Sequence, residues 1–218
     1  MVPMSNFAPL LPLVVPLVPA VPQPVIEFCL RQAAIQICEE TRCWRDVVEF
    51  DADDSTVTLP VSQIAEVHDV EAMFWNGIKL TPLGCMDSAA SRADPREGRP
   101  STFTQVGDGQ FIIDPFLAGQ IRAVVFLKPK QGQIIGFDPT NAFSDSYNAV
   151  PRSMIQAHAM TLALGAVALL CEMPESGAYD PNRAAIFAQR FQAGIDGAKV
   201  KSISGQQRAP LRTKSQWM

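Results

Sequence analysis

The chain has 218 residues, of which 47% are apolar and 18% are charged. This composition supplies enough apolar side chains for a buried core and excludes a globally disordered protein. The low share of charge has two explanations: the core is large, or neighbouring subunits cover part of the surface. The net charge is −4, yet residues 199–218 carry five basic side chains and no acidic one, which is typical of an interaction tail.

The N-terminal segment is apolar and is interrupted by proline every few residues up to Pro24. No basic stretch precedes it, and proline removes the backbone hydrogen bonds that a membrane helix or a signal peptide needs. A targeting signal and a membrane span are therefore not expected. Residues 1–23 are predicted to form an extended arm that docks on a neighbouring protein.

Helical spacing begins at Pro24, a residue that suits the first turn of a helix. Apolar side chains then recur at steps of three and four residues, which predicts an amphipathic helix over 24–43. Two further segments with this spacing lie within 151–198, and the second begins at Asp180 and Pro181, a cap and first-turn pair. Together these segments are predicted to form a small helical bundle.

The intervening region 44–128 is rich in β-branched and aromatic residues that alternate with polar ones. It is predicted to hold about six strands, mostly antiparallel. Asn76 and Gly77 indicate one hairpin turn, and Gly107 and Gly109 indicate another.

The predicted fold class is therefore α+β. A small bundle, made of the first helix and the two C-terminal helices, carries a β-rich antiparallel insertion, with an extended N-terminal arm and a C-terminal tail. Residues 129–150 are a long connection, which in a compact chain is usually functional or mobile. Residues 199–218 form the basic tail.

Candidate residues for catalysis or metal binding are few. His68 lies in a strand pattern and His158 in a helix pattern, and neither stands beside a recognisable nucleophile motif. We interpret the first as a polar strand-face residue and the second as a packing or interface residue. Asp51, Asp53 and Asp54 resemble a calcium loop only loosely, because its glycine and its final glutamate are absent, so a solvated turn is the stronger interpretation.

The five cysteines are odd in number, and no two of them have the C-x-x-C spacing of a zinc or redox motif. Cys29 and Cys38 lie in the apolar pattern of the first helix and are predicted to be small core residues with reduced thiols. We therefore predict no catalytic, cofactor-binding or metal-binding residues, and no cofactor. The protein is predicted not to be an enzyme.

The basic tail holds the candidate partner-binding residues, which are spaced cations with two apolar side chains. These residues are Arg208, Leu211, Arg212, Lys214 and Trp217. Such a segment can wrap over an acidic protein partner or over DNA, and the alternative is a disordered end without a partner. We favour the partner, and a protein over DNA.

Two blocks of sequence resemble the head-to-tail adaptor (connector or neck) proteins of tailed bacteriophages. The first is Pro24–Trp44, a helix that ends in Thr-Arg and then a tryptophan just before the first strand. The second is Leu169–Pro174, followed by Asp180, Pro181 and a last helix that leads into a basic tail. The resemblance covers most of the chain by the order of its elements, and its motifs are structural.

The resemblance implies that copies of the chain form a ring, twelvefold, beneath the portal of the filled head. The helical part would surround the channel through which packaged DNA passes. The β-part would project outward or toward the next neck or tail protein, and the tail would bind the portal. No membrane partner is implied. The protein would be made in the cytoplasm of the host bacterium and would reside at the head–tail junction of the virion.

Two alternatives remain open at this point. The first is a tail-tube completion protein or a head decoration protein, which is also a structural virion protein but lies at another position in the particle. A small α+β enzyme or ligand-binding domain belongs to another class, and it would need a pocket with convergent polar groups, which the sequence does not show.

Overall fold

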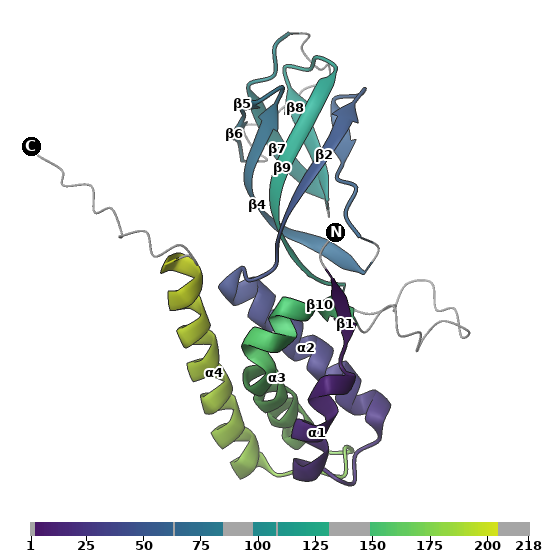
Figure 1. Cartoon of the computed structure of the whole chain (residues 1–218), viewed down its shortest axis with the longest axis vertical. Helices are drawn as coiled ribbons and strands as arrows, with labels where there is room; N and C mark the ends of the chain where they lie inside the picture. The colour runs from purple at the N-terminus through teal and green to yellow at the C-terminus, as the bar shows by residue number, and fades with distance from the viewer. Residues whose placement is uncertain (1–2, 63, 85–97, 108, 131–148, 205–218) are drawn as a thin grey trace, which may run out of the picture. The chain divides into compact units, whose positions relative to one another are not determined.

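The computed structural model describes residues 3–62, 64–84, 98–107, 109–130 and 149–204, with side chains as far as Lys201. The chain divides into two compact units (Figure 1). The helical unit consists of Met1–Cys43 and Gln133–Met218, and the β unit consists of Trp44–Gly132. Helices and largely antiparallel strands are both abundant, which confirms the predicted α+β class.

Three long helices form most of the helical unit and lie against one another (Figure 1). They are α2 (Gln23–Thr41), α3 (Arg152–Glu172) and α4 (Pro181–Ser204). Helix α2 has proline in its first turn and ends at Arg42, whose left-handed conformation (φ 53°) stops the helix. Helix α4 continues past residue 198, so it includes the first residues of the predicted tail.

The helices approach closely because small residues lie where they meet. A side chain at Gly165 of α3 would place its Cβ 2.6 Å from Phe191 of α4 and 2.9 Å from Ala33 of α2. Large apolar residues fill the rest of this core: Leu30, Ile37, Leu162 and Phe191. Leu169 of α3 is partly exposed. Helix α3 is long and apolar enough to cross a bilayer, but over half of that window is buried in the helical unit, which accounts for its composition.

The N-terminal segment differs from the extended arm that we expected. Its described part forms a short strand and then a series of single helical turns: β1 (Met4–Asn6), η1 (Ala8–Leu10), α1 (Leu11–Val14) and η2 (Val15–Leu17). Each turn has proline at its first or second position, where the missing N–H costs nothing. Phe7, Leu10, Val14 and Val18 are almost fully buried, and η1 and α1 contact α3. The segment therefore belongs to the core of its own subunit.

Strand β1 is held by a strand from the other end of the unit. It pairs antiparallel with β10 (Ala149–Pro151), just before α3. Most of the predicted connection 129–150 lies outside the described residues.

Two four-stranded sheets form the β unit (Figure 1). The first has the order β2-β9-β4-β5, with β2 at Arg45–Ala52, β9 at Gly119–Pro129, β4 at Ala65–Trp75 and β5 at Ile78–Lys79. The second has the order β3-β8-β7-β6, with β3 at Thr56–Thr58, β8 at Gln110–Asp114, β7 at Thr102–Gly107 and β6 at Thr81–Pro82. All neighbours are antiparallel except β6 and β7.

Both predicted hairpins are present. Asn76 (φ 45°) and Gly77 (φ 79°) make the turn between β4 and β5, with the two positive φ values that a tight hairpin turn of this type requires. Gly109 (φ 68°) lies in the connection between β7 and β8. The chain enters the first sheet through β2 and leaves it through β9 at the same end, where the Leu127 N–H donates to the Trp44 carbonyl at 2.8 Å.

Candidate functional site

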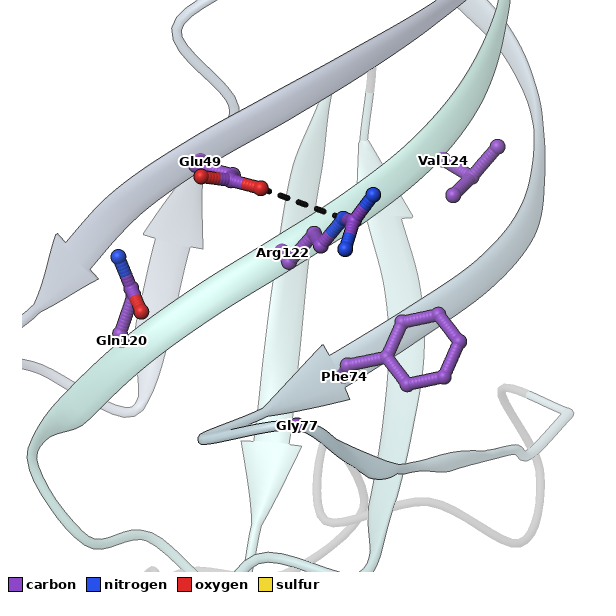
Figure 2. Close-up of a pocket in the computed structure, with 6 residues that line it drawn as sticks. All are labelled: Glu49, Phe74, Gly77, Gln120, Arg122 and Val124. Carbon is purple, nitrogen blue, oxygen red and sulfur yellow. Dashed lines mark ion pairs between the residues drawn. The ribbon is translucent and has the colours of Figure 1, made fainter.

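The outer face of the sheet β2-β9-β4-β5 carries an open depression with a volume of about 430 Å³ (Figure 2). Its lining residues are Glu49, Phe74, Gly77, Gln120, Arg122 and Val124. Strand register brings three of them together, because Arg122 lies opposite Glu49 on β2 and opposite Phe74 on β4. The side chains of opposed residues share one face of the sheet.

Charge on this face is paired but accessible. Arg122 Nε lies 3.2 Å from Glu49 Oε1, and both side chains are more than half exposed. Arg45 Nη2 lies 2.7 Å from Glu71 Oε2, again near the surface. Exposed pairs of this kind contribute little to stability, so their charges can also serve a partner. An exposed arginine beside an aromatic ring is favoured at protein–protein contacts, and this face suits such a contact better than small-molecule chemistry.

The two histidines lie in different units. His68 is half-buried at a bulge of β4, where the register to β9 shifts between Val67 and Asp69. His158 is half-buried on α3 at a kink in the helix (φ −126°, ψ 19°). Burial lowers the pKa of His158, and the nearby Lys201 ammonium lowers it further.

The cysteines of the first helix are buried, as predicted. Cys29 and Cys38 are fully buried thiols, and burial raises the pKa of Cys29 to about 11. Cys43 differs, because a hydrogen bond from Cys38, and to a smaller extent one from Thr41, lowers its pKa to about 7 against the opposing effect of burial. Within the described residues, no group of three or more His, Cys, Asp or Glu side chains is placed to hold a metal ion.

The aspartate-rich segment after β2 is a hydrogen-bonded turn. The Asp54 carboxylate accepts the Ser55 hydroxyl at 3.1 Å and the Thr56 N–H at 3.4 Å. These bonds, with Ser55 first, lower the pKa of Asp54. Asp51, Asp53 and Asp54 are exposed, which agrees with the interpretation as a solvated turn.

The five partner-binding residues predicted in the tail lie outside the described residues. Helix α4 leads directly to them and ends at Ser204. One cation that we assigned to the tail has an internal role instead: Lys199 Nζ lies 2.6 Å from Glu40 Oε2 of α2. This hydrogen bond is the main reason that the pKa of Glu40 is lowered. Lys199 therefore stabilises the helical unit.

The depression on the sheet was not predicted from the sequence. The alternation around Glu49 and Arg122 shows that both side chains point away from the core. It does not show that they meet, because β2 and β9 are separated by more than sixty residues and their pairing is not a local property.

Comparison with known proteins settles the family. The family model described as SU10 adaptor protein matches residues 16–214, more than nine-tenths of the chain. The chain belongs to the SU10 adaptor protein family. Membership gives it a structural adaptor role in a bacteriophage and makes it a virion component, which confirms the resemblance found in the sequence. No curated protein matches the chain.

The match of the SU10 adaptor protein family spans both units. It begins within the proline-rich segment, covers the β unit and reaches Lys214 in the tail. Four of the five predicted partner-binding residues lie inside it, and Trp217 lies beyond it.

Proposed function

We propose that this SU10 adaptor is one subunit of a head-to-tail adaptor ring that joins the portal of the phage head to the neck or tail. The ring is twelvefold and surrounds the channel for packaged DNA. The protein acts by assembly and not by catalysis. It is made in the cytoplasm of the host bacterium and resides at the head–tail junction. The observation that carries the proposal is the family match across both units and most of the tail.

Exposed apolar side chains on the helical unit support a role in assembly. Met160 of α3 is 60% exposed, and Ile186 and Val200 of α4 are 51% and 65% exposed. On the N-terminal turns, Val15 and Leu17 are also exposed. A ring requires two different faces on each subunit that fit each other, and apolar residues at the surface are typical of such faces.

The tail is proposed to bind the portal through Arg208, Leu211, Arg212, Lys214 and Trp217. A segment with so few apolar groups gains little by folding alone, because burial cannot offset its loss of conformational entropy. Its cations suit an acidic or polar groove, and Leu211 and Trp217 supply the apolar contacts. The tail directly follows α4 in the sequence, and this continuity supports a segment that reaches to a neighbour.

The ring is tested by native mass spectrometry and electron microscopy of the full-length protein, alone and mixed with portal rings of the same phage. The expected result is a closed complex with one adaptor for each portal subunit. An adaptor that binds tail tubes and not portals would instead identify a tail-tube completion protein, and binding to the head shell away from the portal would identify a decoration protein. Particles that contain no copy of the chain would contradict a virion role altogether.

The tail is tested by comparing full-length protein with protein that lacks 205–218, against portal rings and against duplex DNA, over a series of salt concentrations. Binding to a protein groove predicts a shallow salt dependence and a large loss for Trp217→Ala, with Gln216→Ala as the matched control. Binding to DNA predicts that log K falls with log salt at a slope of about −0.9 for each neutralised phosphate. Equal portal binding with and without the tail would refute this part of the proposal.

A further inference from the structure

Strand β2 is an edge strand of the sheet β2-β9-β4-β5, and within the described residues no other strand pairs with its outer side. It pairs with β9 along all eight of its residues, Arg45–Ala52, and the register has no bulge. The strand contains no proline. A long, regular edge of this kind can accept a further strand, which is why most proteins interrupt or cover such edges.

The backbone groups on this edge can be assigned residue by residue. The Leu127 N–H donates to the Trp44 carbonyl, so the even-numbered residues of this strand bond to β9. The odd-numbered residues therefore point their N–H and C=O groups outward, and no backbone group in the described part of the chain pairs with them. The Val47 N–H is capped by the Asp46 carboxylate at 2.9 Å, as expected of an edge group that lacks a strand partner.

The opposite side of the sheet is a poor template for the same contact. Strand β4 has two bulges, between Val67 and Asp69 and between Val70 and Ala72, and β5 covers its end. A bulged strand bends and cannot continue a straight ladder. The open edge of β2 is thus better matched by another straight strand than by β4 of a second copy.

We propose that β2 pairs antiparallel with β2 of a second copy, about a two-fold axis at Val48. In this register every outward residue meets an outward residue, as hydrogen bonding requires. Arg45 lies opposite Asp51 of the second copy at both ends of the strand, and Val47 lies opposite Glu49. The strand is complementary to itself in charge, which is the property that a two-fold interface needs.

Neighbouring registers are less favourable. A shift of two residues toward the C-terminus brings Glu49 opposite its own copy, a like-charge contact. A shift of two residues the other way brings Arg45 opposite Glu49, but it shortens the paired segment and leaves Asp51 outside it. Asp51 is exposed and has no ion pair within the described residues, and the two-fold register places Arg45 of the second copy opposite it.

The pairing is limited to two copies, because the described part of each copy has one long, regular edge and a two-fold contact uses the edges of both copies. A cyclic ring contains no two-fold axis between adjacent subunits. The pair is therefore a form of the free protein, in which it protects the edge from uncontrolled association before the copies enter a particle.

The first test replaces one outward N–H. Glu49→Pro removes the backbone N–H of residue 49, which does not bond to β9. The substitution therefore blocks pairing at the edge and leaves the hydrogen bonds between β2 and β9 complete. Glu49→Ala is the matched control, since it removes the same ion pair with Arg122 but keeps the N–H. Sedimentation of the full-length protein over a wide concentration range should give a dimer for wild type and Glu49→Ala, and a monomer with unchanged circular dichroism for Glu49→Pro.

The second test is a charge exchange that does not depend on how proline is tolerated. Arg45→Asp or Asp51→Arg alone places like charges opposite each other twice and should weaken the dimer about tenfold. The double variant Arg45→Asp/Asp51→Arg should restore it. A wild-type protein that stays monomeric, or an oligomer that neither Glu49→Pro nor the single charge changes affect, would overturn the proposal.

Discussion

Substitution of Gly165 by alanine tests the packing of the three long helices. The new Cβ would lie 2.6 Å and 2.8 Å from two ring carbons of Phe191 and 2.9 Å from the Cβ of Ala33. Real Cβ atoms essentially never approach another heavy atom within 3 Å, so α2 or α4 must move or the phenyl ring must leave its position. The ring is 7% exposed and has little free space.

Two opposing effects set the magnitude. Overpacking of a filled core costs about 1–3 kcal/mol. Replacement of glycine by alanine within a helix returns about 1 kcal/mol, because the unfolded chain loses less entropy. The expected net loss for Gly165→Ala is therefore up to about 2 kcal/mol. Gly197 of α4 is the matched control: nothing lies within 4 Å of its added Cβ, so Gly197→Ala should raise stability by up to about 1 kcal/mol.

The measurement is urea unfolding of both variants and of wild type, followed by circular dichroism at the helix band. We expect the two variants to shift the midpoint in opposite directions. If Gly165→Ala raised the midpoint as Gly197→Ala is expected to do, the close approach of α2, α3 and α4 would be refuted. An unfolding midpoint lowered equally by both changes would mean that α4 is not a regular helix at Gly197.

Three further predictions concern other parts of the chain. Phe7→Ala should lower the free energy of unfolding, measured by urea denaturation, by about 3–5 kcal/mol, because the ring is almost fully buried. A loss below about 1 kcal/mol would mean that the N-terminal segment does not pack in the core. Gly119→Ala places a Cβ 2.5 Å from Nε1 of Trp75 and should destabilise the β unit by about 1–3 kcal/mol. The measurement is unfolding followed by tryptophan fluorescence. An unchanged unfolding midpoint would contradict the sheet register at Gly119. Cys43, with a pKa of about 7, should react with iodoacetamide before Cys29 does, and its rate should rise through neutral pH as the thiolate forms. If peptide mapping finds Cys29 modified first, the hydrogen bonds at Cys43 and the burial of Cys29 would be contradicted.

Local sequence patterns predicted the helices and turns that are determined by residues close together in the sequence. The helix over 24–43 is observed at Gln23–Thr41, because apolar spacing and a first-turn proline both act within a few residues. The turn at Asn76 and Gly77 was predictable for a similar reason, since few residues other than asparagine and glycine adopt the positive φ values that it needs.

The N-terminal segment was predicted to be extended because it contains many prolines, yet it forms helical turns. Frequent prolines favour the prediction of an extended chain, although proline at the start of a helical turn costs no hydrogen bond. Phe7, Leu10, Val14 and Val18 are spaced by three and four residues, and this spacing is the feature that indicates a helical, buried segment.

The candidate site could not be predicted in the same way. The depression depends on the pairing of β2 with β9 and of β9 with β4, and strand pairing between distant segments follows from packing of the whole unit. The tail residues are predicted from spaced cations and two apolar side chains, and they lie outside the described residues. The family, in contrast, was recognisable from the order of elements.

The path of the chain through the β unit has an evolutionary consequence. Residues 44–132 form one uninterrupted stretch of gene, and their first and last strands are hydrogen-bonded neighbours, with the Leu127 N–H 2.8 Å from the Trp44 carbonyl. A short peptide could therefore bridge the two ends if the stretch were removed, and a different module with adjacent ends could take its place. Recombination between phage genomes can thus exchange this unit in a single step while the helices keep their own sequence. Such an exchange would give the adaptor a new β unit without redesign of the helical unit.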